Sequence, residues 1–150
     1  MSKADFRAMR ETAGYSQQAL ADALNVNIRT VKRWEHESDA SEAPKDAWEL
    51  LGNAVKTQLK AADYALQVAL EQAEAHPSAA KKAAITYFRD QAMFDRYGRD
   101  EGYFGVANAN ARAAAMELMR EGFMVEFRYP CEDIDSSISA ARSTTESGSA

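Results

Sequence analysis

The chain has 150 residues, of which 46% are hydrophobic, 27% are charged and 9% are aromatic. This mixture excludes collagen-like and low-complexity proteins, and it supplies enough apolar side chains for a buried core in one domain or two small ones. The net charge of −5 argues weakly against a nucleic-acid partner, but residues 1–36 hold six basic and four acidic residues, whereas the remainder holds 12 basic and 19 acidic ones. The positive charge is therefore concentrated near the N-terminus.

Residues that carry catalytic or metal chemistry are scarce. The single cysteine, Cys131, excludes an intrachain disulfide, and two histidines, His36 and His76, leave little material for a metal or catalytic site. No apolar run approaches the ~18 residues of a membrane span, and the N-terminus lacks the apolar segment of a signal peptide. We therefore expect a cytoplasmic protein that is not an enzyme and has no metal, cofactor or membrane contact.

Three short helices are expected first, over residues 4–13, 17–24 and 27–35. Their ends are marked by residues that cap helices or permit tight turns, namely Gly14, Ser16, Asn25 and Asn27. Each helix has apolar residues at helical spacing, which predicts one inward-facing side on each helix.

A longer helix is expected after the polar loop 36–43. Pro44 suits its first turn, and His76-Pro77 ends it. One apolar stripe follows the helical period and comprises Trp48, Leu51, Val55, Leu59, Ala62, Leu66, Ala69 and Ala73. This period favours packing on a core over a long coiled coil, and Gly52 marks a candidate break.

The second half mixes strand and helix patterns. A short β-prone run covers 85–88, helical patterns cover 89–97 and 103–120, and alternation over 123–129 indicates a strand. We therefore expect a mainly α fold, with a helix-turn-helix domain and connecting helix over 1–76 and a small α+β module over 77–130. Residues 131–150 include eight Ser or Thr and are expected to form a disordered tail.

Residues 16–35 follow the helix-turn-helix pattern, in which two short helices share an apolar core across a tight turn. A small residue, Ala21, stands where the helices approach, and the core positions are Leu20, Leu24, Val26, Val31 and Trp34. The segment resembles the Cro/CI-type (XRE-like) family in the Ser16-Gln17 pair that opens the second helix and the Trp34-Glu35 pair that closes the third. It departs from that family at Asn25, where Gly is commonest, and at Glu35-His36-Glu37, where Glu-x-Gly is frequent.

The third helix of such a motif can enter the major groove of DNA, which is ~12 Å wide. Its outward positions are Asn27, Ile28, Arg29, Lys32 and Arg33. Arg29 and Arg33 share a face, and an arginine fork can bridge O6 and N7 of guanine. Lys32 can reach a base or a phosphate, and Ile28 a thymine methyl. The family resemblance implies one more contact, between Gln17 and a phosphate.

Several of these positions also have a purely structural interpretation. Asn27 could serve only as a helix cap, Ile28 only in packing, and Lys32 only as a solvated side chain. Trp34 lies on an inward position, which predicts a core residue rather than a stacking platform.

The aromatic-rich second half has no recognisable ligand motif. Two short strands are not stable alone, so we expect them to pair with each other or with a second subunit, and the module to dimerise the protein. The candidate dimerisation residues are Tyr87, Phe88, Phe104, Phe123, Val125 and Phe127. The alternative is that these aromatic residues form the core of a monomer.

The order of elements also resembles that of anti-CRISPR-associated (Aca) phage repressors, with loose matches at Tyr87-Phe88, Tyr97–Gly105 and Glu121-Gly122-Phe123. That resemblance implies an autorepressor that dimerises through its C-terminal domain and binds an inverted repeat at its own promoter. In some relatives the same basic helix also binds the messenger RNA.

The sequence thus predicts a transcriptional regulator, a dimeric repressor that reads a palindromic operator in double-stranded DNA through residues 27–35. Two alternatives remain open. One is an antitoxin or protein-interaction module, and the other is an RNA-binding translational repressor that uses the same helix.

Overall fold

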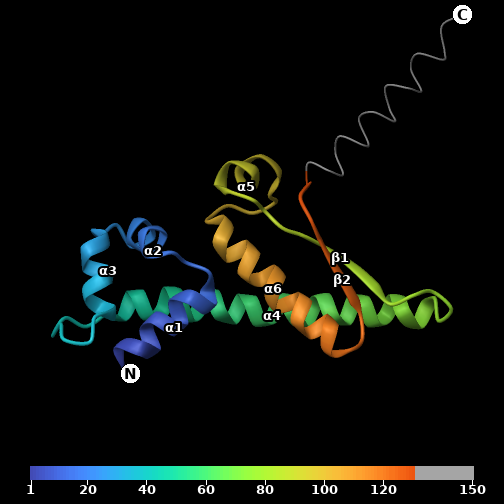
Figure 1. The fold of residues 1–150 in the computed structure, drawn as a ribbon, viewed down its shortest axis with the longest axis horizontal. Helices are drawn as coiled ribbons and strands as arrows, with labels where there is room; N and C mark the ends of the chain where they lie inside the picture. The colour runs from blue at the N-terminus through green and yellow to red at the C-terminus, as the bar shows by residue number, and fades with distance from the viewer. Residues whose placement is uncertain (131–150) are drawn as a thin grey trace, which may run out of the picture.

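A computed structural model describes residues 1–130 as a mainly helical protein with a small parallel sheet (Figure 1). Its elements are α1 (Lys3–Ala13), α2 (Gln17–Leu24), α3 (Ile28–Glu35), α4 (Lys45–Ala75), β1 (Lys82–Thr86), α5 (Gln91–Tyr97), α6 (Phe104–Arg120) and β2 (Met124–Arg128). The expected fold class, mainly α with a small α+β module, is confirmed. The tail prediction and Cys131 lie outside the described residues. Within residues 1–130, no helix has both the length and the apolar character that crossing a membrane requires.

Helices α1 to α3 pack around the first turns of α4. The side chain of Ser16 accepts a hydrogen bond from the N–H of Ala19 at the start of α2, and Asn25 ends that helix in the left-handed conformation at φ 53°. The core of this region comprises Phe6, Ala13, Leu20, Ala21, Val31, Trp34, Ala47 and Leu51, all buried. The Phe6 ring lies edge-on to two indoles, at 5.8 Å from Trp34 and 5.0 Å from Trp48. Trp34 is therefore a core residue, as expected.

Helix α4 departs from the expected pattern in two ways. It continues unbroken through Gly52, because one glycine costs only ~1 kcal/mol in a helix interior and the 31-residue helix has packing partners on both sides of it. Leu59, predicted on the buried stripe, is 60% exposed, whereas Gln58 is buried. Gln58 faces inward because its side-chain amide donates a 2.8 Å hydrogen bond to the backbone oxygen of Thr12, near the end of α1.

The C-terminal module joins β1 to β2 through α5 and α6. The two strands pair in parallel, with Ala83 opposite Val125 and Ile85 opposite Phe127, and α6 packs on α4 (Figure 1). A parallel pair requires a long crossover connection, which the two helices supply.

The strands and one helix of this module are shorter or shifted relative to the expected ranges. Residues Lys82–Thr86 form β1, so Phe88 of the predicted run 85–88 lies beyond the strand. It leaves the sheet because the side chain of Asn108, buried on α6, binds both its backbone N–H and its backbone oxygen, at 2.9 and 2.7 Å. The helix expected from residue 89 begins at Gln91, because the side chain of Asp90 caps it.

The two halves of the chain meet where α1 ends against the start of α6. A Cβ atom on Gly14 would lie 2.2 Å from the backbone oxygen of Gly105, and one on Gly105 would lie 2.4 Å from the oxygen of Gly14. Beside them the rings of Tyr15 and Tyr103 stack, with centroids 5.8 Å apart and planes inclined by 13°. This close approach of two backbones holds the end of α1 against the start of α6.

Candidate nucleic-acid interface

Helices α2 and α3 are joined by a tight turn that positions α3 at the surface. After Asn25 the N–H of Val26 bonds to the oxygen of Ala21 at 2.9 Å, and α3 starts two residues later. Val31 is fully buried against Leu20 and Ala21. One face of α3 is therefore fixed to the core, and the other is left to solvent.

The outward face of α3 displays three cationic side chains. Arg29, Lys32 and Arg33 are all exposed, as the sequence predicts. Ile28 is half-buried and packs against the N-terminal core. Asn27 is exposed, and its side-chain oxygen accepts a hydrogen bond from the N–H of Arg29 at 2.9 Å, so it caps α3.

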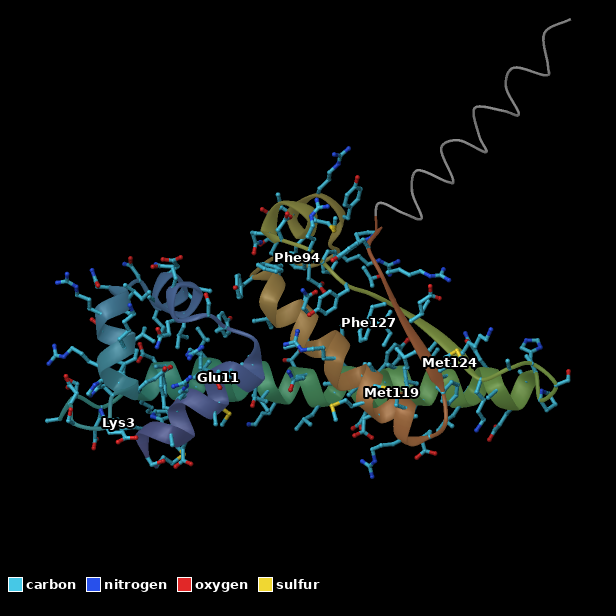
Figure 2. All side chains as sticks on the ribbon, in the orientation of Figure 1. Lys3, Glu11, Phe94, Met119, Met124 and Phe127 are labelled. Carbon is cyan, nitrogen blue, oxygen red and sulfur yellow. The ribbon has the colours of Figure 1, made fainter. Side chains whose placement is uncertain are left out.

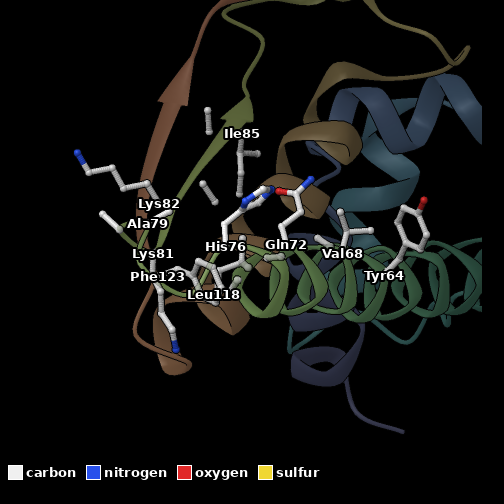
Figure 3. Close-up of a pocket in the computed structure, with 16 residues that line it drawn as sticks. Tyr64, Val68, Gln72, His76, Ala79, Lys81, Lys82, Ile85, Leu118 and Phe123 are labelled. Atoms are coloured by element: carbon white, nitrogen blue, oxygen red, sulfur yellow. The ribbon is translucent and has the colours of Figure 1, made fainter.

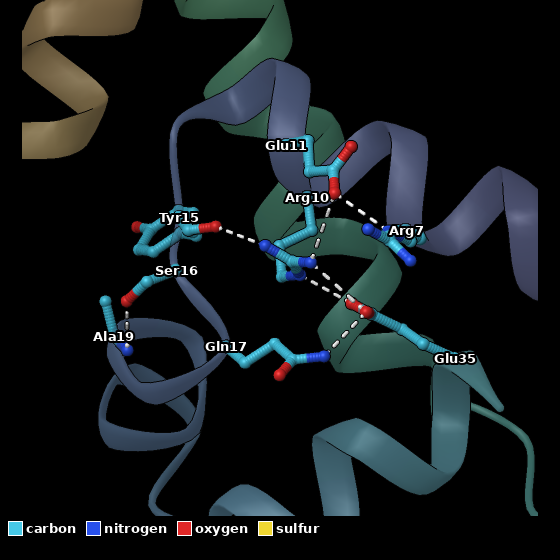
Figure 4. A network of polar contacts seen from close by, with 8 residues as sticks. All are labelled: Arg7, Arg10, Glu11, Tyr15, Ser16, Gln17, Ala19 and Glu35. Atoms are coloured by element: carbon cyan, nitrogen blue, oxygen red, sulfur yellow. Dashed lines mark hydrogen bonds and ion pairs between the residues drawn. The ribbon is translucent and has the colours of Figure 1, made fainter.

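A buried ion pair clamps α1, α2 and α3 together (Figure 4). The guanidinium of Arg10 donates to both carboxylate oxygens of Glu35, at 2.5 and 3.1 Å, and to the backbone oxygen of Tyr15 at 2.7 Å. The side chains of Arg10 and Glu35 are 8% and 5% exposed. Gln17 joins this network, because its amide nitrogen donates to Glu35 at 2.9 Å.

This network changes the interpretation of Gln17. Its side-chain N–H group, predicted to meet a phosphate, is directed into the protein toward Glu35. The first turn of α2 still offers backbone N–H groups at the helix N-terminus, where an anion binds favourably. No local sequence pattern predicts the network, since Arg10 and Glu35 lie on different helices.

A second polar cluster lies at the C-terminal end of α3. The Nε of Arg33 donates to the carboxylate of Asp39 at 3.0 Å, and the other oxygen of that carboxylate accepts from the N–H of Ser41 at 2.8 Å. The side chain and backbone of Ser41, and then the guanidinium of Arg33, lower the pKa of Asp39 well below its usual range. Lys3 donates to the backbone oxygens of Arg33 and Ser41, which ties the loop to α3.

Asp39 therefore binds one edge of the Arg33 guanidinium, the group that is predicted from the sequence to contact a DNA base. The bond uses only Nε, so the two terminal nitrogens of Arg33 are not engaged by the carboxylate. Asp39 was not among the predicted site residues, and a six-residue separation across a loop is not a pattern that identifies such a pair.

The predicted dimerisation residues occupy different environments. Phe123 is buried within the protomer, and the ring of Phe88 packs edge-on to Phe94 at 5.0 Å. Phe104 and Val125 are half-buried. Tyr87 packs edge-on to Phe127 at 5.4 Å, and Phe127 is 43% exposed. Much of this aromatic set therefore packs within one chain.

Other large apolar side chains are more exposed than the predicted set. They are Leu59, Tyr64, Met116, Met119 and Met124 (Met119 and Met124 are labelled in Figure 2). An open apolar groove of about 520 Å³ also lies between α4 and β1, and Figure 3 shows Val68, Gln72 and Ile85 among its lining residues. The helical period of α4 predicts a stripe that packs on a core, so this period does not indicate the groove or the exposed side chains.

A comparison of the sequence with known protein families and with curated protein sequences finds no match.

Proposed function

We propose that this protein is a sequence-specific DNA-binding regulator of transcription that acts in the cytoplasm as a dimeric repressor. The observation that carries the proposal is the outward display of Arg29, Lys32 and Arg33 on a helix whose opposite face is buried. An α-helix fits the major groove of DNA, and arginine forks match the acceptor pair of guanine.

The scaffold beneath α3 supports this role. The buried Arg10–Glu35 pair fixes the end of α3 to α1 and α2, so the three cations project from a rigid frame. Rigid presentation favours base recognition because little conformational entropy is lost on binding. Repression then requires no chemistry, since a bound dimer occupies the promoter.

Dimerisation would place two copies of α3 about one turn of DNA apart, ~34 Å between half-site centres. The operator is therefore expected to be an inverted repeat. The C-terminal module is the proposed site of dimerisation, because it carries exposed apolar side chains on α6 and β2.

The test is selection of binding sites from a random duplex DNA library, followed by binding measurements at two salt concentrations. We expect an enriched inverted repeat, and we expect Arg33→Ala to weaken binding to it by ~1–3 kcal/mol without changing the fold. Lys60→Ala, which removes an exposed cation from α4, is the matched control. Absence of any enriched sequence, or equal affinities for all three proteins, would contradict the proposal.

A second candidate function is an antitoxin or protein-interaction module. The groove between α4 and β1 favours it, since an exposed apolar surface on a small protein is a common binding site for another protein. Light scattering on the pure protein distinguishes these two functions, because a stable dimer favours the repressor.

An RNA-binding role for α3 is tested separately. Competition between the selected duplex and a hairpin RNA shows whether the basic face of α3 binds RNA rather than DNA.

A further inference from the structure

The sheet of the C-terminal module ends at β2. Within residues 1–130 it has two strands, and β1 lies between β2 and the groove beside α4 (Figure 3). No strand in this part of the chain pairs with the outer edge of β2. A two-stranded sheet is marginal by itself, and an open strand edge is a template for pairing with another strand.

The hydrogen bonds to β1 establish which backbone groups of β2 face outward. Met124 donates to the oxygen of Lys81, and the oxygen of Arg128 accepts from Tyr87, both at 2.9 Å. Alternate residues of an extended strand direct their N–H and C=O groups to opposite edges. The backbone groups of Val125 and Phe127 therefore point away from β1.

We propose that β2 pairs antiparallel with β2 of a second copy of this chain, about a two-fold axis at Phe127. The proposal rests on the dimer proposed above and identifies its interface. In this register Phe127 of each chain exchanges two backbone hydrogen bonds with Phe127 of the other. The result is a continuous four-stranded sheet in which β2 occupies the two central positions.

Charge selects this register. With the axis at Phe127, Glu126 stands opposite the partner's Arg128, and Arg128 opposite the partner's Glu126. An axis at Glu126 would place like charges face to face, and an axis at Val125 would place Glu126 opposite the partner's Met124. Opposite charges in cross-strand positions stabilise a sheet, and like charges destabilise it.

The side chains of Glu126 and Arg128 are both exposed. Within one chain, Arg128 and Glu126 pair at 3.0 Å, with 45% and 64% of their side-chain surfaces exposed. An ion pair this exposed contributes little to the stability of the single chain. Phe127 on β2 and Tyr129 just beyond the end of β2, 43% and 37% exposed, lie along the edge that the second copy would cover.

The test is a charge-reversal mixing experiment on the full chain, followed by analytical ultracentrifugation. The wild type is expected to be a dimer. Glu126→Arg makes both positions basic, and Arg128→Glu makes both acidic, so each variant alone faces like charges and should dimerise at least about tenfold more weakly. Mixed in equal amounts, the two variants should form a heterodimer, because every opposed pair is then complementary.

The mixing step separates an interface from a role within one chain. Either substitution breaks the intrachain pair, and mixing cannot restore it inside a single chain. A monomeric wild type, single variants that dimerise as the wild type does, or variants that fail to associate on mixing would each overturn the proposal. Circular dichroism melting shows whether each single variant is folded, and the double variant Glu126→Arg/Arg128→Glu, which restores complementarity, is expected to dimerise even if a single variant unfolds.

The outcome does not depend on DNA binding. A dimer that follows the charge rule but enriches no DNA sequence refutes the regulator and leaves the interface standing. A protein that enriches an operator but ignores the charge reversals refutes this interface alone.

Discussion

The two ends of the molecule differ in how completely a single chain buries their apolar side chains and pairs their backbone groups. In the N-terminal region, α1 to α3 and the start of α4 bury a contiguous apolar core and seal a bidentate ion pair inside it. In the C-terminal module, a two-stranded sheet leaves one face and the edge of β2 open within residues 1–130.

The contrast indicates different roles in the proposed function: the N-terminal region presents α3 to a ligand, and the C-terminal module associates with a second copy of the chain. The N-terminal region is complete in one chain, so it can hold α3 in a fixed orientation for a ligand. The C-terminal module keeps exposed apolar side chains such as Met116 and Met124, which a second copy could cover. The stability of the N-terminal region is expected to be independent of protein concentration, whereas that of the C-terminal module is expected to increase with it.

The largest expected effect follows from removing one partner of the buried ion pair. Glu35→Ala leaves the Arg10 guanidinium buried without its carboxylate, so we expect a loss of ~3–5 kcal/mol in the free energy of unfolding. Denaturant unfolding measures this. Glu37→Ala, an exposed carboxylate two residues away, should stay within about 0.5 kcal/mol of the wild type. A similar small change for Glu35→Ala would show that the N-terminal region does not depend on the pair.

A smaller effect is expected at the contact between the two regions. Gly105→Ala places a Cβ atom against the oxygen of Gly14 and the ring of Tyr103, so the helices must separate, at a cost of ~1–3 kcal/mol. Gly52→Ala is the matched control, because a Cβ there meets nothing within 4 Å and alanine favours the helix by ~1 kcal/mol. Gly105→Ala is therefore expected to lower the thermal unfolding temperature, and Gly52→Ala to raise it. A change of the same sign in both variants would mean that Gly14 and Gly105 are not in close contact.

The smallest expected effect concerns acid and the Arg33–Asp39 pair. Because the pKa of Asp39 is lowered in the folded protein, its contribution is complete above the ordinary aspartate pKa and is lost as the pH falls through the lower folded value. The Arg33 Nε–H resonance should therefore stay constant from neutral pH to about pH 4 and shift only below it. Asp39→Asn should abolish the shift. Movement of the resonance well above pH 4 would show that the pair is not formed.

Local features of the fold could be predicted from the sequence. Ser16, Asn25 and Asn27 act within a few residues of their own positions, so their patterns fix where α2 and α3 begin and end. The exposure of the three cations follows from the same helical period that buries Val31 and Trp34.

Features that join distant segments could not be predicted in the same way. Gln58 is buried because it meets Thr12, 46 residues away, and no periodicity on α4 contains that information. The Arg10–Glu35 pair likewise joins two segments that are distant in the sequence. The parallel pairing is compatible with a feature of the sequence, because two strands separated by two helices have the long connection that parallel pairing requires.

Helix α4 links both regions along one rod. Its 31 residues span about 46 Å at 1.5 Å per residue, with Ala47 and Leu51 in the N-terminal core and Ala62 buried further along. One residue inserted between Leu51 and Gln58 would rotate everything downstream by about 100° and carry Gly105 away from Gly14. The length of this stretch is thus fixed by geometry, whereas the loop over 36–43 can absorb insertions wherever the ties of Lys3 and Asp39 are kept.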